Sequence, residues 1–208
     1  TKKGSGILAL TGANTFTGNL TLGAGTLNLD HASALGAAPG VLVINGGTLD
    51  NTSGADITLG GAKPQTWNTD VAFTGTHSLF MGGGAVTLGG SGTSRTVNVA
   101  ANTLGVGSLN GPGYGLVKTG PGMLLINRNA AGTLGGPLDI QQGIVGTSED
   151  LYATGLAGTG ILQNSGLSQS YCVHLALHTY HVFGAIVRTL GGSGTYQIGL
   201  LKRGTGTL

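Results

Sequence analysis

The densest group of potential metal ligands in this sequence is the stretch YCVHLALHTYH. It places Cys172, His174, His178 and His181 within ten residues, and sulfur and imidazole nitrogen are ligands of zinc and copper. On a strand, Cys172, His174 and His178 would share one face, whereas on a helix the three histidines would. The two conformations therefore choose different ligands. Successive side chains on one strand face are also about 7 Å apart, which is wide for one ion.

A strand with one apolar face explains the same stretch without a ligand. Val173, Leu175 and Leu177 alternate with polar side chains, as a half-buried strand requires. No acidic residue or second cysteine completes a metal site, so we predict no metal and no cofactor and keep a metal-binding insert at 172–181 as an alternative. Because residues 167–183 contain no glycine, we also expect a local insertion or irregular turn over residues 163–183.

The acidic residues do not form a recognisable catalytic group. Glycosidases use paired carboxylates, but Glu149 and Asp150 are adjacent and would point to opposite faces of a strand. We therefore predict a polar loop there, no catalytic residue and no enzyme activity. The seven acids are Asp30, Asp50, Asp56, Asp70, Asp139, Glu149 and Asp150.

The glycine-rich stretch GPGYGLVKTG resembles a phosphate-binding loop only superficially. A P-loop needs glycine directly before its lysine, and here Val117 precedes Lys118 and Thr119. The spacing indicates turns. The Thr-x-Thr pair at Thr15 and Thr17 does not recur at a regular period in the sequence, so we expect no threonine array of the kind that binds ice.

The composition excludes several classes of protein. Glycine is 43 of 208 residues, charged residues are 8% and hydrophobic residues are 39%, which fits neither a disordered chain nor collagen. A net charge of +2 without a basic block provides no electrostatic surface for nucleic acid. The single cysteine allows no internal disulfide, and no apolar run is long enough to span a membrane. No signal peptide is recognisable, so we expect any export signal to lie outside this chain.

A short unit, apolar-x-apolar-x-x-Gly-x-apolar, recurs five times and predicts an all-β solenoid. Asn102 replaces glycine in one copy, and because both residues tolerate a positive φ, the position predicts a turn between strands. The copies start 22, 37, 18 and 41 residues apart, near 20 or twice 20, as if a degenerate copy were skipped. We therefore predict a parallel β-helix of about 20 residues per turn rather than a β-sandwich. The copies start at Leu20, Leu42, Leu79, Val97 and Leu138.

The first 29 residues resemble a known repeat. KKGSGILALTGANTFTGNLTLGAGTLNL, from Lys2 to Leu29, is similar to the autotransporter-associated β-strand repeat, also called the passenger-associated transport repeat. Its opening phrase, Lys-x-Gly-x-Gly-x-Leu, returns at Lys118 and Lys202. The resemblance covers most of the chain, except roughly Gln163 to His181. We expect the three lysines to lie on a solvated face.

The resemblance implies a right-handed parallel β-helix at the surface of a bacterium. Residues 1–208 would form one segment of a longer secreted passenger, associated with the outer membrane and non-enzymatic, with a structural or adhesive role. Its partners would be glycans or proteins of a host or environmental surface, without nucleic acid or membrane insertion, and the segment would be monomeric. A carbohydrate-active β-helix, such as a polysaccharide lyase or glycosidase, is the main alternative.

Overall fold

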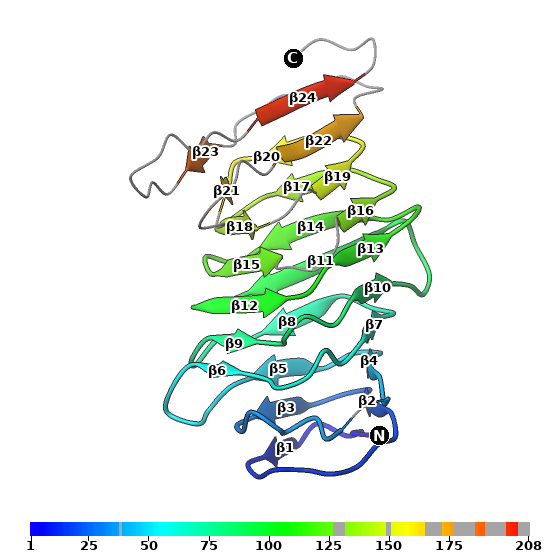
Figure 1. Ribbon diagram of the computed structural model, residues 1–208, viewed down its shortest axis with the longest axis vertical. Helices are drawn as coiled ribbons and strands as arrows, with labels where there is room; N and C mark the ends of the chain where they lie inside the picture. The colour runs from blue at the N-terminus through cyan, green and yellow to red at the C-terminus, as the bar shows by residue number, and fades with distance from the viewer. Residues whose placement is uncertain are drawn as a thin grey trace.

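The computed structural model is a stack of coils built from three parallel sheets (Figure 1). It describes residues 1–37, 39–126, 132–148, 151–164, 172–176, 186–189 and 199–203, with side-chain positions through residue 163. Every regular element in this part of the chain is a β-strand, and none of it forms a helix that could cross a membrane. The all-β parallel β-helix predicted from the sequence is therefore confirmed.

Each coil runs through the three sheets in turn, which we call sheets A, B and C. Sheet A contains nine strands: β2 (Leu20–Leu22), β4 (Leu42–Ile44), β7 (Gln65–Trp67), β10 (Val86–Leu88), β13 (Leu109–Gly111), β16 (Gly132–Leu134), β19 (Leu151–Ala153), β22 (Cys172–Ala176) and β24 (Gly199–Arg203). Sheet B contains eight: β1 (Ile7–Leu10), β3 (Thr26–Leu29), β5 (Thr48–Asp50), β8 (Val71–Phe73), β11 (Ser94–Val99), β14 (Gly115–Thr119), β17 (Leu138–Ile140) and β20 (Leu156–Gly158). Sheet C contains seven: β6 (Ile57–Thr58), β9 (Leu79–Phe80), β12 (Thr103–Val106), β15 (Met123–Ile126), β18 (Ile144–Thr147), β21 (Ile161–Asn164) and β23 (Ile186–Thr189).

The pairing register follows the repeat. Leu20 pairs with Leu42 and Leu22 with Ile44 in parallel, as a solenoid requires of the first two copies of the unit. Pairs one coil apart are separated by 22 residues there, by 21 between Gln65 and Val86, and by 22 between Leu116 and Leu138. The predicted turn length of about 20 residues is therefore confirmed.

The irregular spacing of the five copies arises because the unit forms corners, and a coil has three. The first two copies join sheet A to sheet B, the copy at Leu79 joins sheet C to sheet A, and those at Val97 and Leu138 join sheet B to sheet C. The expectation of skipped copies was wrong, since the spacings are whole turns or turns plus part of one. Asn102 has a φ of 52°, which confirms the predicted left-handed turn.

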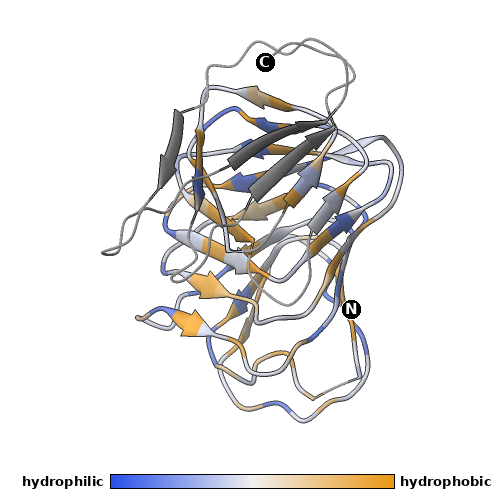
Figure 2. Ribbon diagram, turned by 45° about the horizontal axis from the view of Figure 1, so that its top comes forward, coloured by the Kyte–Doolittle hydropathy of each residue, from blue (hydrophilic) through white to orange (hydrophobic). Residues whose placement is uncertain are grey.

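Inward-facing apolar side chains form continuous columns along the stack. Leu22, Ile44 and Trp67 pair in successive coils of sheet A and are at most 1% exposed. Figure 2 shows strongly apolar residues on strands of all three sheets. Stacking of these columns removes apolar surface from water in every coil, which is the main driving force for the fold.

Two lysines occupy positions in these apolar columns, so the expectation of a solvated face was wrong for Lys2 and Lys118. Lys118 pairs with Val97 and Ile140 and is 0% exposed, while Lys2 pairs with Leu22 and is 9% exposed. Lys202 takes the same column as Lys2, since it pairs with Leu175, but its side chain lies outside the described part.

The two buried ammonium groups bind main-chain carbonyls in the same way. Lys118 Nζ donates to the carbonyls of Thr119 at 2.7 Å, Gly120 at 2.8 Å and Gln142 at 3.3 Å. The first two acceptors belong to the corner that follows the lysine. The third belongs to the next coil, two residues beyond Ile140, the strand partner of Lys118. Each ammonium therefore ties two coils together.

Lys2 repeats this geometry at a different corner. Its Nζ donates to the carbonyls of Lys3 at 3.0 Å, Gly4 at 2.7 Å and Ala24 at 3.0 Å, and Ala24 is two residues beyond its strand partner Leu22. We call each arrangement a lysine clamp. Because the same three acceptor positions recur, the clamp is a property of the sequence phrase and not of one corner.

Glycine is required around the clamp for two reasons. Gly4 and Gly120 have φ values of 74° and 76°, which directs their carbonyls toward the ammonium. In the next coil, Gly25 also has a positive φ, and a Cβ there would collide with the Nζ of Lys2. The phrase Lys-x-Gly-x-Gly thus places one buried cation among carbonyls that have no room for side chains.

Burial lowers the pKa of Lys118 from 10.5 to about 8. Desolvation disfavours the charged form, and the three carbonyl acceptors oppose that effect because they bind the ammonium. With a pKa of about 8, most Lys118 is charged at pH 7.

We predict that Lys118→Met weakens the fold although it preserves the length of the side chain. The substitution leaves three buried carbonyls without their donor, so we expect the free energy of unfolding to fall by about 1–3 kcal/mol. Chemical denaturation followed by circular dichroism measures this change. Lys3→Met is the control, because Lys3 is exposed. Equal stability of the Lys118→Met and Lys3→Met variants would contradict the clamp.

We also predict a specific pH dependence. Between pH 8 and 10.5 the unfolded chain keeps the Lys118 proton longer than the folded chain, because the folded pKa is the lower one. Unfolding free energy therefore rises with pH in this window, by at most about 1.4 kcal/mol per pH unit for one group. We expect the stability of the wild type to increase relative to Lys118→Met over this range. A difference that stays flat or decreases would show that Lys118 does not titrate there.

Candidate functional site

The described acids mainly connect successive coils. Asp50 accepts hydrogen bonds from Thr76 through the main-chain nitrogen at 2.9 Å and Oγ1 at 2.7 Å, and Asp30 does the same with Thr52 at 2.6 and 2.8 Å. Asp70 accepts from the main-chain nitrogen of Thr96 at 2.8 Å. These carboxylates satisfy backbone donors of the next coil.

No catalytic or metal-binding group forms among the residues whose positions are described. Asp56 accepts from the nitrogen of Ser78 at 2.8 Å, and Asp139 from Nε2 of Gln141 at 3.0 Å. Nowhere in this part of the chain do three His, Cys, Asp or Glu side chains gather closely enough to hold a metal ion. Glu149 and Asp150 lie outside the described residues, so the loop predicted for them stays a prediction.

Cys172 and His174 lie on strand β22, which is one coil of sheet A. His174 pairs with Tyr152 on β19 and with Leu201 on β24, so the strand interpretation of this stretch holds for residues 172–176. His178 and His181 lie outside the described residues. The metal-binding insert and the irregular turn over 163–183 therefore stay predictions.

Two further buried cations were not anticipated from the sequence. Lys63 donates to the carbonyl of Ala37 at 3.0 Å and lies 5.4 Å from the ring centre of Phe16, and burial lowers its pKa. Arg95 donates to the carbonyls of Gly89, Ser91 and Ser94 and stacks 4.9 Å from the ring centre of Tyr114. Neither residue belongs to the repeated phrase that marks Lys2 and Lys118.

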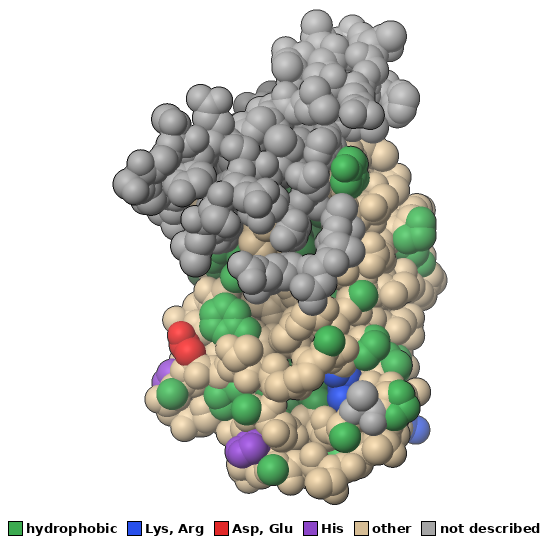
Figure 3. Space-filling view, viewed as in Figure 1, with side chains coloured by type: hydrophobic (Ala, Val, Ile, Leu, Met, Phe, Trp, Pro, Cys, Tyr) green, Lys and Arg blue, Asp and Glu red, His purple; other side chains and the backbone are tan. Residues whose placement is uncertain are grey.

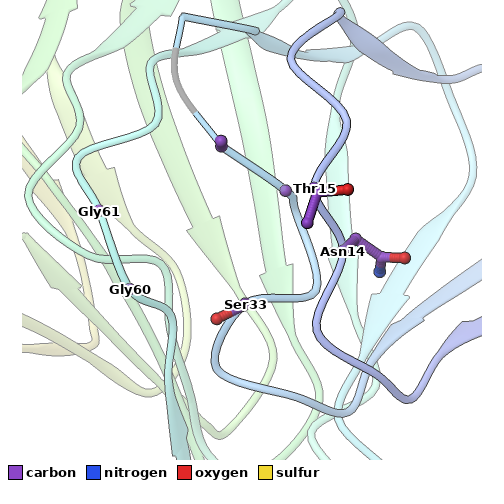
Figure 4. Close-up of a pocket in the computed structure, with 7 residues that line it drawn as sticks. Asn14, Thr15, Ser33, Gly60 and Gly61 are labelled. Atoms are coloured by element: carbon purple, nitrogen blue, oxygen red, sulfur yellow. The ribbon is translucent and has the colours of Figure 1, made fainter.

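A shallow pocket lies beside Lys63, where loops of three successive coils meet (Figure 4). Its volume is about 380 Å³. Asn14 and Thr15 come from the first loop, and Gly60 and Gly61 from the third. Figure 4 shows the Gly60–Gly61 segment facing the segment of Asn14 and Thr15, with Ser33 below. The lining residues are Asn14, Thr15, Ser33, Gly36, Ala37, Gly60 and Gly61.

The loops around the pocket are bonded to one another. The main-chain nitrogen of Asn14 donates to the carbonyl of Ser33 at 3.2 Å, and that of Ala37 to the carbonyl of Phe16 at 3.0 Å. Asn14 Nδ2 donates to the carbonyls of Gly12 at 3.2 Å and Ala34 at 2.9 Å. The carboxamide is therefore held in place, and its oxygen is left for another partner.

Two hydroxyl groups of the pocket have no use in the fold. The side chains of Thr15 and Ser33 make no hydrogen bond to any residue of the described chain. Both residues are exposed. The pocket thus offers uncharged donors and acceptors and no carboxylate.

The glycines keep the pocket open. Gly36 has a φ of 69°, and a Cβ there would collide with the carbonyl of Phe16. Gly60 differs, because its backbone is ordinary and the nearest atom to a Cβ would be the carbonyl oxygen of Ala32 at 3.6 Å. Packing therefore requires glycine at position 36 but not at position 60.

Sequence patterns marked part of this pocket without revealing it. Asn14 and Thr15 belong to the Asn-Thr-aromatic-Thr-Gly segment of the repeat, but Ser33, Ala37 and Gly60 have no distinguishing signal. The pocket exists only because loops about one coil apart stack, and a single copy of the repeat cannot show that.

Comparison with known proteins agrees with the predicted repeat. Residues 1–29 match the family described as Passenger-associated-transport-repeat. The chain is 31% identical over 175 residues to the protein named Adhesin BmaC autotransporter, from Brucella suis biovar 1 (strain 1330). That alignment covers 79% of this chain but 5% of the relative. No solved structure gives a significant match.

These findings agree with the structural repeat. The matched residues 1–29 contain the clamp of Lys2 and the strands β1, β2 and β3, so the matched family unit is one full coil of the solenoid together with the lysine that ties it to its neighbour. The parallel β-helix and the two matches together identify the chain as a passenger-associated transport repeat protein.

Proposed function

We propose that this chain is a non-enzymatic, adhesive segment of a passenger exposed on a bacterial cell surface. The observation that carries the proposal is the similarity to an autotransporter adhesin over most of the chain. The chain spans 5% of that relative, so adhesion is inferred for the segment and not transferred from the whole protein.

The outer face of sheet A supports this role. One side chain per coil projects from the middle of each strand, and strand spacing sets these side chains about 4.8 Å apart. Threonine recurs here, which the sequence pattern did not lead us to expect, although in one column and not in an array. In register the column is Thr21, Val43, Thr66, Thr87, Asn110, Thr133 and Tyr152.

This column provides an uncharged contact surface on a rigid support. Thr87, Thr133 and Tyr152 are exposed, with Tyr152 at 39%. On the face shown in Figure 3, charged side chains are sparse among the described residues. Hydroxyl and amide groups can exchange hydrogen bonds with sugars or with protein main chains, and an aromatic ring adds apolar contact area.

A carbohydrate-active enzyme is less well supported. Each described acid accepts a hydrogen bond that helps hold the coils or a neighbouring side chain. A glycosidase needs two carboxyl groups facing one substrate. We therefore do not propose catalysis for this segment.

Surface display tests the adhesive role. We expect a non-adherent bacterium that displays this chain through an inert outer-membrane anchor to attach to host-cell monolayers or glycan-coated surfaces several-fold better than cells with the anchor alone. Attachment is counted after washing. If the displayed, protease-resistant chain does not increase attachment to any of these surfaces, the proposal fails.

A matched pair of variants locates the adhesive face. Replacing Thr66, Thr87 and Thr133 with lysine places three charges on the outer face of sheet A, and we expect attachment to fall to the level of the anchor. The control replaces Thr48, Asn98 and Thr119, which occupy an equivalent outer column of sheet B, and we expect it to keep attachment. Equal loss in both variants would assign the effect to charge in general and not to sheet A.

A further inference from the structure

We propose that the pocket between the loops of the first three coils binds a single neutral sugar ring. This inference deepens the proposed adhesive function and rests on it, since it names a site and a ligand class. The site consists of the side chains of Asn14, Thr15 and Ser33 and the glycine wall at Gly60 and Gly61.

The available polar groups fit a ligand rich in hydroxyls. The Thr15 and Ser33 hydroxyls have no partner within the described part of the chain, and each can both donate and accept. Asn14 adds a carboxamide oxygen whose own NH₂ group is already committed to two carbonyls. A sugar ring presents alternating donors and acceptors of the same kind.

The charges around the pocket favour a neutral ligand. All seven lining residues are uncharged. The neighbouring ammonium of Lys63 is directed to the carbonyl of Ala37 and the ring of Phe16, and its residue is 6% exposed. An anionic ligand would therefore find no accessible cation in the lining, and a cationic ligand would find no carboxylate.

The shape of the pocket sets the size and the affinity of the ligand. A volume of about 380 Å³ falls near the lower end of the range of roughly 300–1,000 Å³ for ligand pockets. The glycine wall admits a flat ring, because no side chain projects from Gly60 or Gly61. Since the pocket is shallow and most of its lining is exposed, we expect a dissociation constant on the order of millimolar.

The site is preorganised by the fold. Main-chain hydrogen bonds join Asn14 to Ser33, Gly36 to Ser33 and Gly60 to Ala32, at 3.2, 3.1 and 2.7 Å. These bonds connect three coils, so the three loops hold their relative positions without a ligand. Little conformational entropy is lost on binding, which favours weak but specific recognition.

Titration with simple glycosides tests the pocket directly. The probes are the methyl glycosides of glucose, galactose, mannose and N-acetylglucosamine, added separately to the isotope-labelled chain. We expect at least one of them to shift the amide resonances of Thr15, Ser33, Gly60 and Gly61 in a saturable manner at millimolar concentration. Absence of saturable shifts at these residues with all four glycosides would overturn the proposal.

Variants that spare the fold separate recognition from stability. Thr15→Val combined with Ser33→Ala removes two hydroxyls that bond to no described residue, and Gly60→Leu fills the pocket from a position where a Cβ meets nothing closer than 3.6 Å. We expect at least tenfold weaker binding in each, with an unchanged unfolding midpoint. Full binding by both variants would also overturn the proposal.

Two control substitutions lie in the same repeat outside the pocket. Thr17→Val removes an exposed hydroxyl, and Gly18→Leu adds a side chain where a Cβ has no neighbour within 4 Å. We expect both to bind the glycoside like the wild type. Equal losses in the controls would place the binding elsewhere.

The outcomes for the pocket and for adhesion can be told apart. Attachment of displayed cells without glycoside binding would remove the pocket and leave the adhesive role intact. Glycoside binding by a chain that confers no attachment would leave the pocket standing and remove the proposed function.

Discussion

The buried ammonium group that binds carbonyls of two coils is the interaction on which the corners of this solenoid depend. Apolar columns stabilise the flat sheets, but a corner turns the backbone out of the ladder and leaves carbonyls without donors, which is costly when they are buried. Lys2 and Lys118 provide up to three donors from one atom. Because a lysine stem is apolar, the side chain also continues the hydrophobic column that it crosses.

Other corners solve the same problem with shorter side chains. Asn102 donates from Nδ2 to the carbonyls of Gly75 at 2.6 Å and Thr76 at 3.2 Å, and Asn51 donates to those of Ala55 and Ser78, each at 2.8 Å. Asp50 works in the opposite sense and accepts from main-chain nitrogen. A corner is therefore defined by a polar side chain that spans two coils, and lysine, asparagine and aspartate serve where carbonyls or amides are left over.

The sequence predicted the sheets well and the corners poorly. The ladder between Leu20 and Leu42 and the left-handed turn at Asn102 follow from local periodicity and backbone preference. The burial of Lys118 does not, because lysine is exposed in most proteins and its three acceptors become visible only when Gln142 is placed in the next coil. The pocket escaped for the same reason, since Asn14 and Gly60 meet across coils.

Use of charged groups inside the stack also shapes the exterior. Of the five basic residues whose side chains are described, only Lys3 is exposed, and Lys2, Lys63, Arg95 and Lys118 are buried against main-chain carbonyls. The chain has 8% charged residues, and the structure places most of those it describes in contacts that hold the coils. The surface that remains is made of hydroxyl, amide and glycine groups, which cannot recognise a partner by charge. Recognition by such a surface depends on hydrogen bonds and shape repeated along the coil, and a rigid stack supplies the fixed spacing that this requires.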